Sequence, residues 1–91
     1  MNNRRTQYEI YWEILTYCKT QRSITQIIQR CNLNSKIGQD YIDFLESKGY
    51  LAKTPEGNKS LYINTPTAKG YLDIFMKLYL ELFKNSPEFR L

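Results

Sequence analysis

The stretch NSKIGQDYIDFLESK, residues 34–48, constrains the fold most, because it is typical of one amphipathic helix with well-marked ends. Asn34 or Ser35 can cap its first turn, and Gly49 can end its last turn. Apolar residues gather on one side of this helix, and these are Ile37, Tyr41, Ile42, Phe44 and Leu45. The opposite side carries groups that donate and accept hydrogen bonds, namely Lys36, Gln39, Asp40 and Asp43. One face is therefore expected to pack, and the other to meet water or a partner.

The segments around this helix predict its neighbours. A short helix over residues 24–30, capped by Ser23, precedes it across a tight link in which Leu33 is expected to be buried. A β-hairpin follows, with the turn sequence PEGN at 55–58 and a loop of about four to six residues. A first helix over residues 6–19 starts with a capping box of Thr6 and Glu9. This order of helix, turn, helix and hairpin is that of a winged helix-turn-helix.

We therefore expect an α+β, mainly helical fold with three helices, a β-hairpin wing and an added long C-terminal helix. Residues 1–64 would form the winged helix-turn-helix domain, and residues 65–91 the C-terminal dimerisation helix and tail. The link at residues 20–23 can hold a very short strand. The last helix is expected to start at the Thr65 cap, to run to about Asn85 and to be stopped by Pro87.

The polar face of the second predicted helix has the chemistry to read duplex DNA. Gln39 can pair with an adenine edge, Lys36 can reach guanine or a phosphate, and Asp40 can accept from cytosine. Asn34 and Ser35 can bind phosphate at the start of the helix, where the helix dipole favours an anion. These five residues are the candidate DNA contacts of the helix.

The hairpin supplies two further candidates. Lys53 and Lys59 flank its turn, which suits contacts to the DNA backbone, although a solvated loop explains them too. Gly38, inside the preceding helix, allows either a close approach to DNA or close packing of two helices, and packing is slightly favoured.

The last helix is apolar on two adjacent stripes. One stripe comprises Tyr71, Phe75, Leu78 and Leu82. The other comprises Leu72, Met76, Tyr79 and Phe83. A helix that lies on its own domain buries one stripe, so the second predicts a homodimer seam, for which we select the stripe with Tyr79. The alternative is that the first helix of the same chain covers both stripes, with Tyr8 and Trp12 over the core edge or against another helix.

Composition narrows the class of function. The 91 residues carry a net charge of +4, which favours an anionic partner only weakly, and they contain no histidine. Without histidine or a nucleophile beside a visible base, we expect no enzyme, no cofactor and no catalytic residue. Cys18 and Cys31 lack the spacing of a metal site and are expected to be buried apolar residues. No apolar run reaches membrane-spanning length, so a cytoplasmic protein without a membrane partner is expected.

The chain resembles the small archaeal winged-helix DNA-binding proteins. The resemblance runs from about Arg4 to Leu82, through RRTQYEIYWEIL, CNLNSKIGQDYIDFLESKGYL and SLYINTPTAKGYLDIF. It implies a homodimer joined by an antiparallel coiled coil of C-terminal helices, and a role in transcription regulation or chromosome organisation. The chain departs from the family at Asn34, where serine is usual, and at Asp40, where a basic or neutral residue is common. Since an acidic helix repels phosphate, a winged-helix module that binds protein instead of DNA is the alternative.

Overall fold

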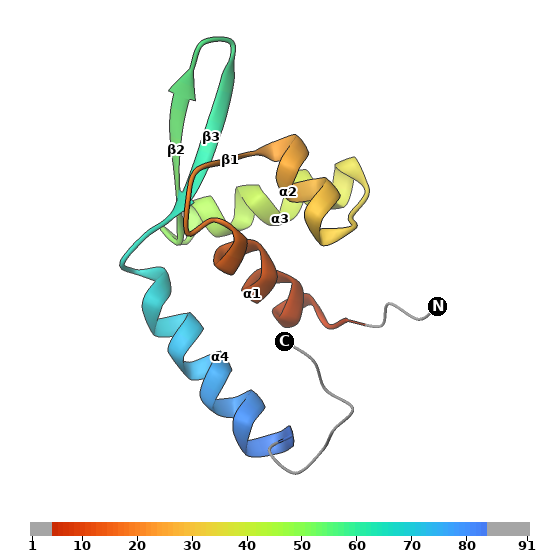
Figure 1. Cartoon of the computed structure of the whole chain (residues 1–91), viewed down its shortest axis with the longest axis vertical. Coiled ribbons are helices and arrows are strands. Elements are labelled where there is room, and N and C mark those ends of the chain that lie inside the picture. The colour runs from red at the N-terminus through yellow and green to blue at the C-terminus, as the bar shows by residue number, and fades with distance from the viewer. Residues whose placement is uncertain (1–4, 84–91) are drawn as a thin grey trace.

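The computed structural model describes residues 5–83. Four helices and a three-stranded sheet follow one another in the order expected for a winged helix-turn-helix (Figure 1). The elements are α1 (Gln7–Tyr17), β1 (Arg22–Ser23), α2 (Ile24–Cys31), α3 (Ser35–Ser47), β2 (Leu51–Glu56), β3 (Lys59–Asn64) and α4 (Ala68–Phe83). The wing projects at one end of the molecule and α4 extends toward the opposite end. None of the helices within residues 5–83 has the length and hydropathy to span a bilayer.

The helix starts are those that the capping residues predict. Thr6 and Glu9 form the expected capping box at α1. Ser23 caps α2 and exchanges hydrogen bonds with Gln26, in a second capping box. Asn34 caps α3 by accepting from the backbone N–H of Ile37 at 2.8 Å. Short polar side chains therefore fix where each helix of the domain begins, because they satisfy N–H groups that have no partner inside the helix.

The sheet has the strand order β1-β3-β2, with both pairs antiparallel. The two-residue strand β1 confirms the short strand expected in the link at residues 20–23. The predicted loop of four to six residues is wrong, because Glu56 pairs with Lys59 and the turn is only Gly57-Asn58. Gly57 has a φ of +60°, which a glycine adopts without the strain a side chain brings. Pro55 is tolerated within the ladder because β2 is an edge strand.

The core lies where α1, α2 and α3 meet the base of the hairpin. Its largest fully buried side chains are Ile14, Leu15, Ile27, Ile42, Leu45, Cys18 and Cys31. Both cysteines are free thiols, and burial raises the pKa of Cys18 to about 12 and that of Cys31 to about 11. They are therefore packing residues with little thiolate at neutral pH. The expectation of small buried apolar residues is confirmed.

The buried face of α3 differs from the predicted one. Gly38, Ile42 and Leu45 face the core, whereas Ile37 and Phe44 are 40% and 44% exposed. An ideal Cβ on Gly38 would lie 2.6 Å from Cγ1 of Ile28, so the glycine lets α2 and α3 approach closely. That close approach rotates Ile37 and Phe44 toward solvent. Leu33 in the turn is only partly buried, although it does pack against the core.

The last helix begins at Ala68, three residues after the Thr65 that was expected to cap it. Residues 66–67 form a turn, in which the N–H of Ala68 donates to the carbonyl of Thr65. The predicted end near Asn85 and the stop at Pro87 lie outside the described residues. The side chain of Phe83 also lies outside the part of the chain that the structure describes.

Candidate nucleic-acid interface

The outward face of α3 is polar, and its side chains are paired with one another along the helix. Lys36 Nζ lies 3.4 Å from Asp40 Oδ2. Gln39 Nε2 donates to Asp43 Oδ1 at 2.8 Å. All four side chains are exposed, so these pairs contribute little to stability and can open when a partner arrives. The face therefore presents donors and acceptors whose directions are set by neighbours one turn away.

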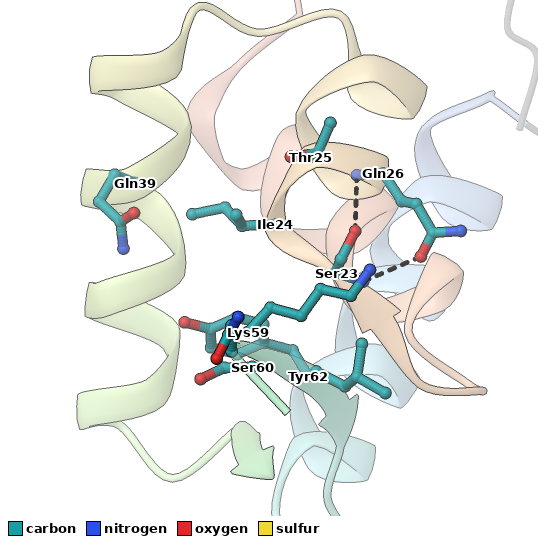
Figure 2. A pocket seen from close by; sticks show the side chains of 10 residues that line it. Ser23, Ile24, Thr25, Gln26, Gln39, Lys59, Ser60 and Tyr62 are labelled. Carbon is teal, nitrogen blue, oxygen red and sulfur yellow. Dashed lines mark hydrogen bonds between the residues drawn. The ribbon is translucent and has the colours of Figure 1, made fainter. Parts of the chain in front are cut away.

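A shallow groove runs between α3, the start of α2 and the wing (Figure 2). Gln39 lies on α3 at one rim, and Lys59 and Ser60 of β3 lie along the wing side. The lining from the start of α2 is made of Ser23, Ile24, Thr25 and Gln26. The structure thus brings Gln39 and Lys59 of the predicted set to one groove.

The residues at the start of α2 were missed by the predicted set. Ser23 and Gln26 are engaged in their own capping box, and Ile24 and Thr25 line the groove between them. The S-x-x-Q pattern in the sequence predicts where this helix begins. It does not predict that the helix start lies beside the wing. That neighbourhood depends on β1 pairing with β3.

The two wing lysines lie on opposite faces of the hairpin. Lys53 is directly across from the buried Tyr62, so these two side chains share a face. Lys59 is an odd number of positions from Tyr62 on β3, so it lies on the other face. Both are exposed, and neither forms an ion pair with another described residue. A single partner surface would therefore contact the two lysines unequally. Lys59 is the lysine that lines the same groove as Gln39.

The start of α3 holds the remaining predicted residues. Asn34 uses its side-chain oxygen for capping, so only its amide nitrogen is left for a phosphate. Ser35 is exposed at the first helical position. The charge of α3 is −2, since Lys36 stands against Asp40, Asp43 and Glu46. Phosphate attraction therefore has to come from basic residues outside α3, and Lys59 is one that lines the same groove as Gln39.

Residues of both apolar stripes of α4 lie against α1 of the same chain. In the stripe expected to face the domain, Trp12 of α1 stacks on Phe75 with ring centroids 6.0 Å apart, and the Tyr71 hydroxyl donates to the carbonyl of Tyr8. The predicted dimer stripe is largely covered as well. Tyr79 is 7% exposed and donates to Glu9 of α1. Leu72 and Met76 are partly buried. The pKa of Tyr79 is raised, mainly by burial and to a smaller extent by the hydrogen bond to Glu9.

Four other apolar residues of α4 stay exposed. Ile74, Leu78 and Leu82 follow one another at spacings of four and are 69%, 53% and 63% exposed. Leu80 is 55% exposed on the opposite flank of the helix. Helix α1 therefore covers one side of α4 and leaves the row of Ile74, Leu78 and Leu82, which we call the α4 row. Two of the three residues of this row, Leu78 and Leu82, come from the stripe that was expected to face the domain.

The comparison with protein families identifies the class. A model of the winged helix-turn-helix family matches residues 4–82, and the chain belongs to that family. An uncharacterized protein of Methanocaldococcus jannaschii is 32% identical over 85 residues, covering 92% of this chain and 82% of that protein. The predicted winged helix-turn-helix fold is thereby confirmed.

Solved structures agree with this assignment. The crystal structure of Sso10a-2, a DNA-binding protein from Sulfolobus solfataricus, matches with a TM-score of 0.75 and 28% identity. The match covers 88% of this chain and 87% of that one. The transcriptional regulator BldR from Sulfolobus solfataricus matches with a TM-score of 0.71 and 17% identity, over 88% of this chain and 63% of that one, which shows the shared fold.

Proposed function

We propose that the protein is a DNA-binding regulator or chromosome-associated protein that binds duplex DNA as a homodimer. In this proposal α3 enters the major groove, and the wing follows the backbone beside it. The observation that carries it is the groove in which Gln39 of α3 and Lys59 of the wing lie together. One side chain there suits a base edge and the other suits a phosphate, which are the two kinds of contact that a sequence-reading protein combines.

The similarity to Sso10a-2, described as a DNA-binding protein, supports the same proposal. The proposed readers are Gln39 and Lys36, with Asp40 as an acceptor from cytosine and with Asn34 and Ser35 near phosphates. Lys59 would contact the backbone from the wing, and Lys53 would do so from its other face. Because α3 itself is acidic, one copy would bind modestly, and two linked copies would bind far more tightly through their high effective concentration.

The homodimer in this proposal forms through α4. The α4 row leaves three large apolar side chains in water, and at spacings of four they form a ridge that can pack into a groove of another helix. A second copy of the same helix, related by a two-fold axis, would cover them. We assign the seam to this row, because Tyr79 of the stripe first selected is already bonded to Glu9 of its own chain.

The test is a fluorescence-anisotropy titration of a labelled duplex of random sequence at several salt concentrations. A DNA binder loses affinity along a straight line of log K against log salt, with a slope that reports the phosphates it neutralises. We expect such a line, with affinity lost between about 50 and 200 mM salt. Absence of binding to any duplex at micromolar protein in 50 mM salt contradicts the proposal.

A protein-binding module is the second candidate. Two observations favour it: the charge of −2 on α3, and exposed apolar side chains on α1 and α3, which are Tyr8, Ile37 and Phe44. The same titration separates the two functions, because a module of this kind has no reason to follow the salt line of a DNA binder.

A further inference from the structure

The strongest unassigned feature of the proposed interface is the bond between Gln39 and Asp43 on α3. Nε2 of Gln39 donates to Oδ1 of Asp43 at 2.8 Å, one helical turn further along. An ionised carboxylate only accepts hydrogen bonds, so it selects the nitrogen of the amide and turns the carbonyl oxygen away. A glutamine without such a neighbour would sample both amide orientations. Asp43 therefore fixes which end of Gln39 is free.

The groups left free match one base. With one N–H held by Asp43, the Gln39 amide still offers its Oε1 acceptor and its second N–H donor. Adenine presents in the major groove a donor at N6 and an acceptor at N7, side by side. The remaining acceptor and donor of Gln39 complement that pair, and the preset orientation removes part of the entropy that the side chain loses on binding.

We propose that Asp43 is a positioning residue that holds the Gln39 amide ready for adenine, at the expense of general affinity for DNA. The inference rests on the proposed function. It explains why an acidic residue lies on the face that approaches phosphates: its charge weakens binding to every sequence, while its oxygen sharpens the reading of one base pair. Selectivity rises whenever the wrong sequences lose more affinity than the right one.

Asp40 provides a matched control on the same face. It carries the same charge and is exposed as Asp43 is, but its carboxylate pairs with Lys36 and forms no described bond with Gln39. Loss of either carboxylate should strengthen nonspecific binding by about twofold or more, from simple charge repulsion at roughly 10 Å. Only the loss of the Asp43 oxygen should change the reading of adenine, whereas the loss of Asp40 should affect the position where cytosine is read in the proposed function.

The experiment selects duplexes from a random-sequence pool with the intact protein and with Asp43→Ala, Asp43→Asn and Asp40→Ala, and then measures affinities for the selected duplex and for its single-base variants. The intact protein should prefer adenine at one position of the selected site. Asp43→Ala should reduce that preference roughly 2- to 10-fold, the value of one exposed hydrogen bond. Asp43→Asn removes the charge and has an amide that both donates and accepts, so it no longer selects one orientation of Gln39; it should lose part of the adenine preference and bind all duplexes more tightly.

The outcomes separate the inference from the proposed function. An unchanged adenine preference in Asp43→Ala overturns the inference, and so does an equal loss in Asp40→Ala; both leave DNA binding intact. Selection of no base by the intact protein, with salt-dependent binding preserved, overturns it as well. Failure of the intact protein to bind any duplex overturns the proposed function and the inference together. Thermal unfolding followed by circular dichroism verifies that each variant is folded.

Discussion

Helices α3 and α4 both pack one side on the domain, but they present opposite chemistry on the other side. The outward side of α3 carries exposed polar side chains that bond to one another, as in the pairs Lys36–Asp40 and Gln39–Asp43. The outward side of α4 carries the α4 row, whose leucines and isoleucine are more than half exposed. The contrast lies entirely in the side chains, since both segments are regular helices.

The difference indicates two kinds of partner. A polar face in water is stable alone and exchanges its bonds with a partner that offers donors and acceptors, such as a DNA groove. An apolar row gains free energy only when it is covered, at about 25 cal/mol for each square ångström removed from water. We therefore expect α3 to bind reversibly and α4 to be covered for most of the lifetime of the protein.

The largest expected effect comes from disrupting the proposed dimer seam on the α4 row. Leu78→Glu together with Leu82→Glu places two carboxylates in the proposed seam, so sedimentation equilibrium should show a dimer for the intact protein and a monomer for the variant. DNA affinity should fall about 100-fold or more, because the avidity of two linked copies is lost. Leu80→Glu, an equally exposed leucine on the other flank, is the control and should stay dimeric. A monomeric intact protein at micromolar concentration would refute the seam.

The next effect concerns the packing that orients α3. Gly38→Ala should lower the free energy of unfolding by about 1–3 kcal/mol, because the new methyl group collides with Ile28. Gly70→Ala is the matched control in α4, where an added Cβ meets nothing within 4 Å, and it should stabilise the protein by about 0.5–1 kcal/mol. Urea denaturation measures both. Equal changes in the two variants would mean that the α2–α3 contact does not require a glycine.

A smaller effect sharpens the account of the polar side. Lys59→Ala should weaken binding to all duplexes and reduce the salt slope by about 1, because one phosphate contact is lost. Lys53→Ala, on the opposite face of the hairpin, should change the slope less. The measurement is the salt titration described above. A larger change for Lys53→Ala would assign the other hairpin face to DNA.

The smallest effect tests how α4 is held on α1. Tyr79→Phe removes the hydroxyl that donates to Glu9, and should cost about 1 kcal/mol of stability at pH 7. Tyr8→Phe changes an exposed ring and should have no effect.

The same pair of variants has a pH dependence. Burial and the bond to Glu9 raise the pKa of Tyr79 in the folded state, so the unfolded chain releases this proton first, from about pH 10. The contribution of Tyr79 is therefore complete below pH 10 and is lost as the pH rises above it. Denaturation at pH 8 and pH 11 should show the advantage of the intact protein over Tyr79→Phe shrinking. An advantage that grows with pH would contradict the assignment.

The sequence by itself determined the order of elements and the starts of α1, α2 and α3. Thr6, Ser23 and Asn34 cap their helices because capping is a local interaction between a side chain and backbone N–H groups two or three residues away. Periodicity likewise predicted the helices, and the apolar content of α4 predicted more surface than one domain covers. Local rules of this kind act within a few residues, and a sequence displays them directly.

Tertiary structure alone decided the rotation of each helix and the neighbours of each candidate residue. Ile37 and Phe44 are exposed because Gly38 meets Ile28, a contact between two helices that periodicity does not reveal. The single groove of Gln39 and Lys59 depends on the pairing of β1 with β3, and the opposite faces of Lys53 and Lys59 depend on strand register. The burial of Tyr79 depends on where α1 crosses α4. These relations join residues far apart in the chain, so close packing selects them and local propensity does not.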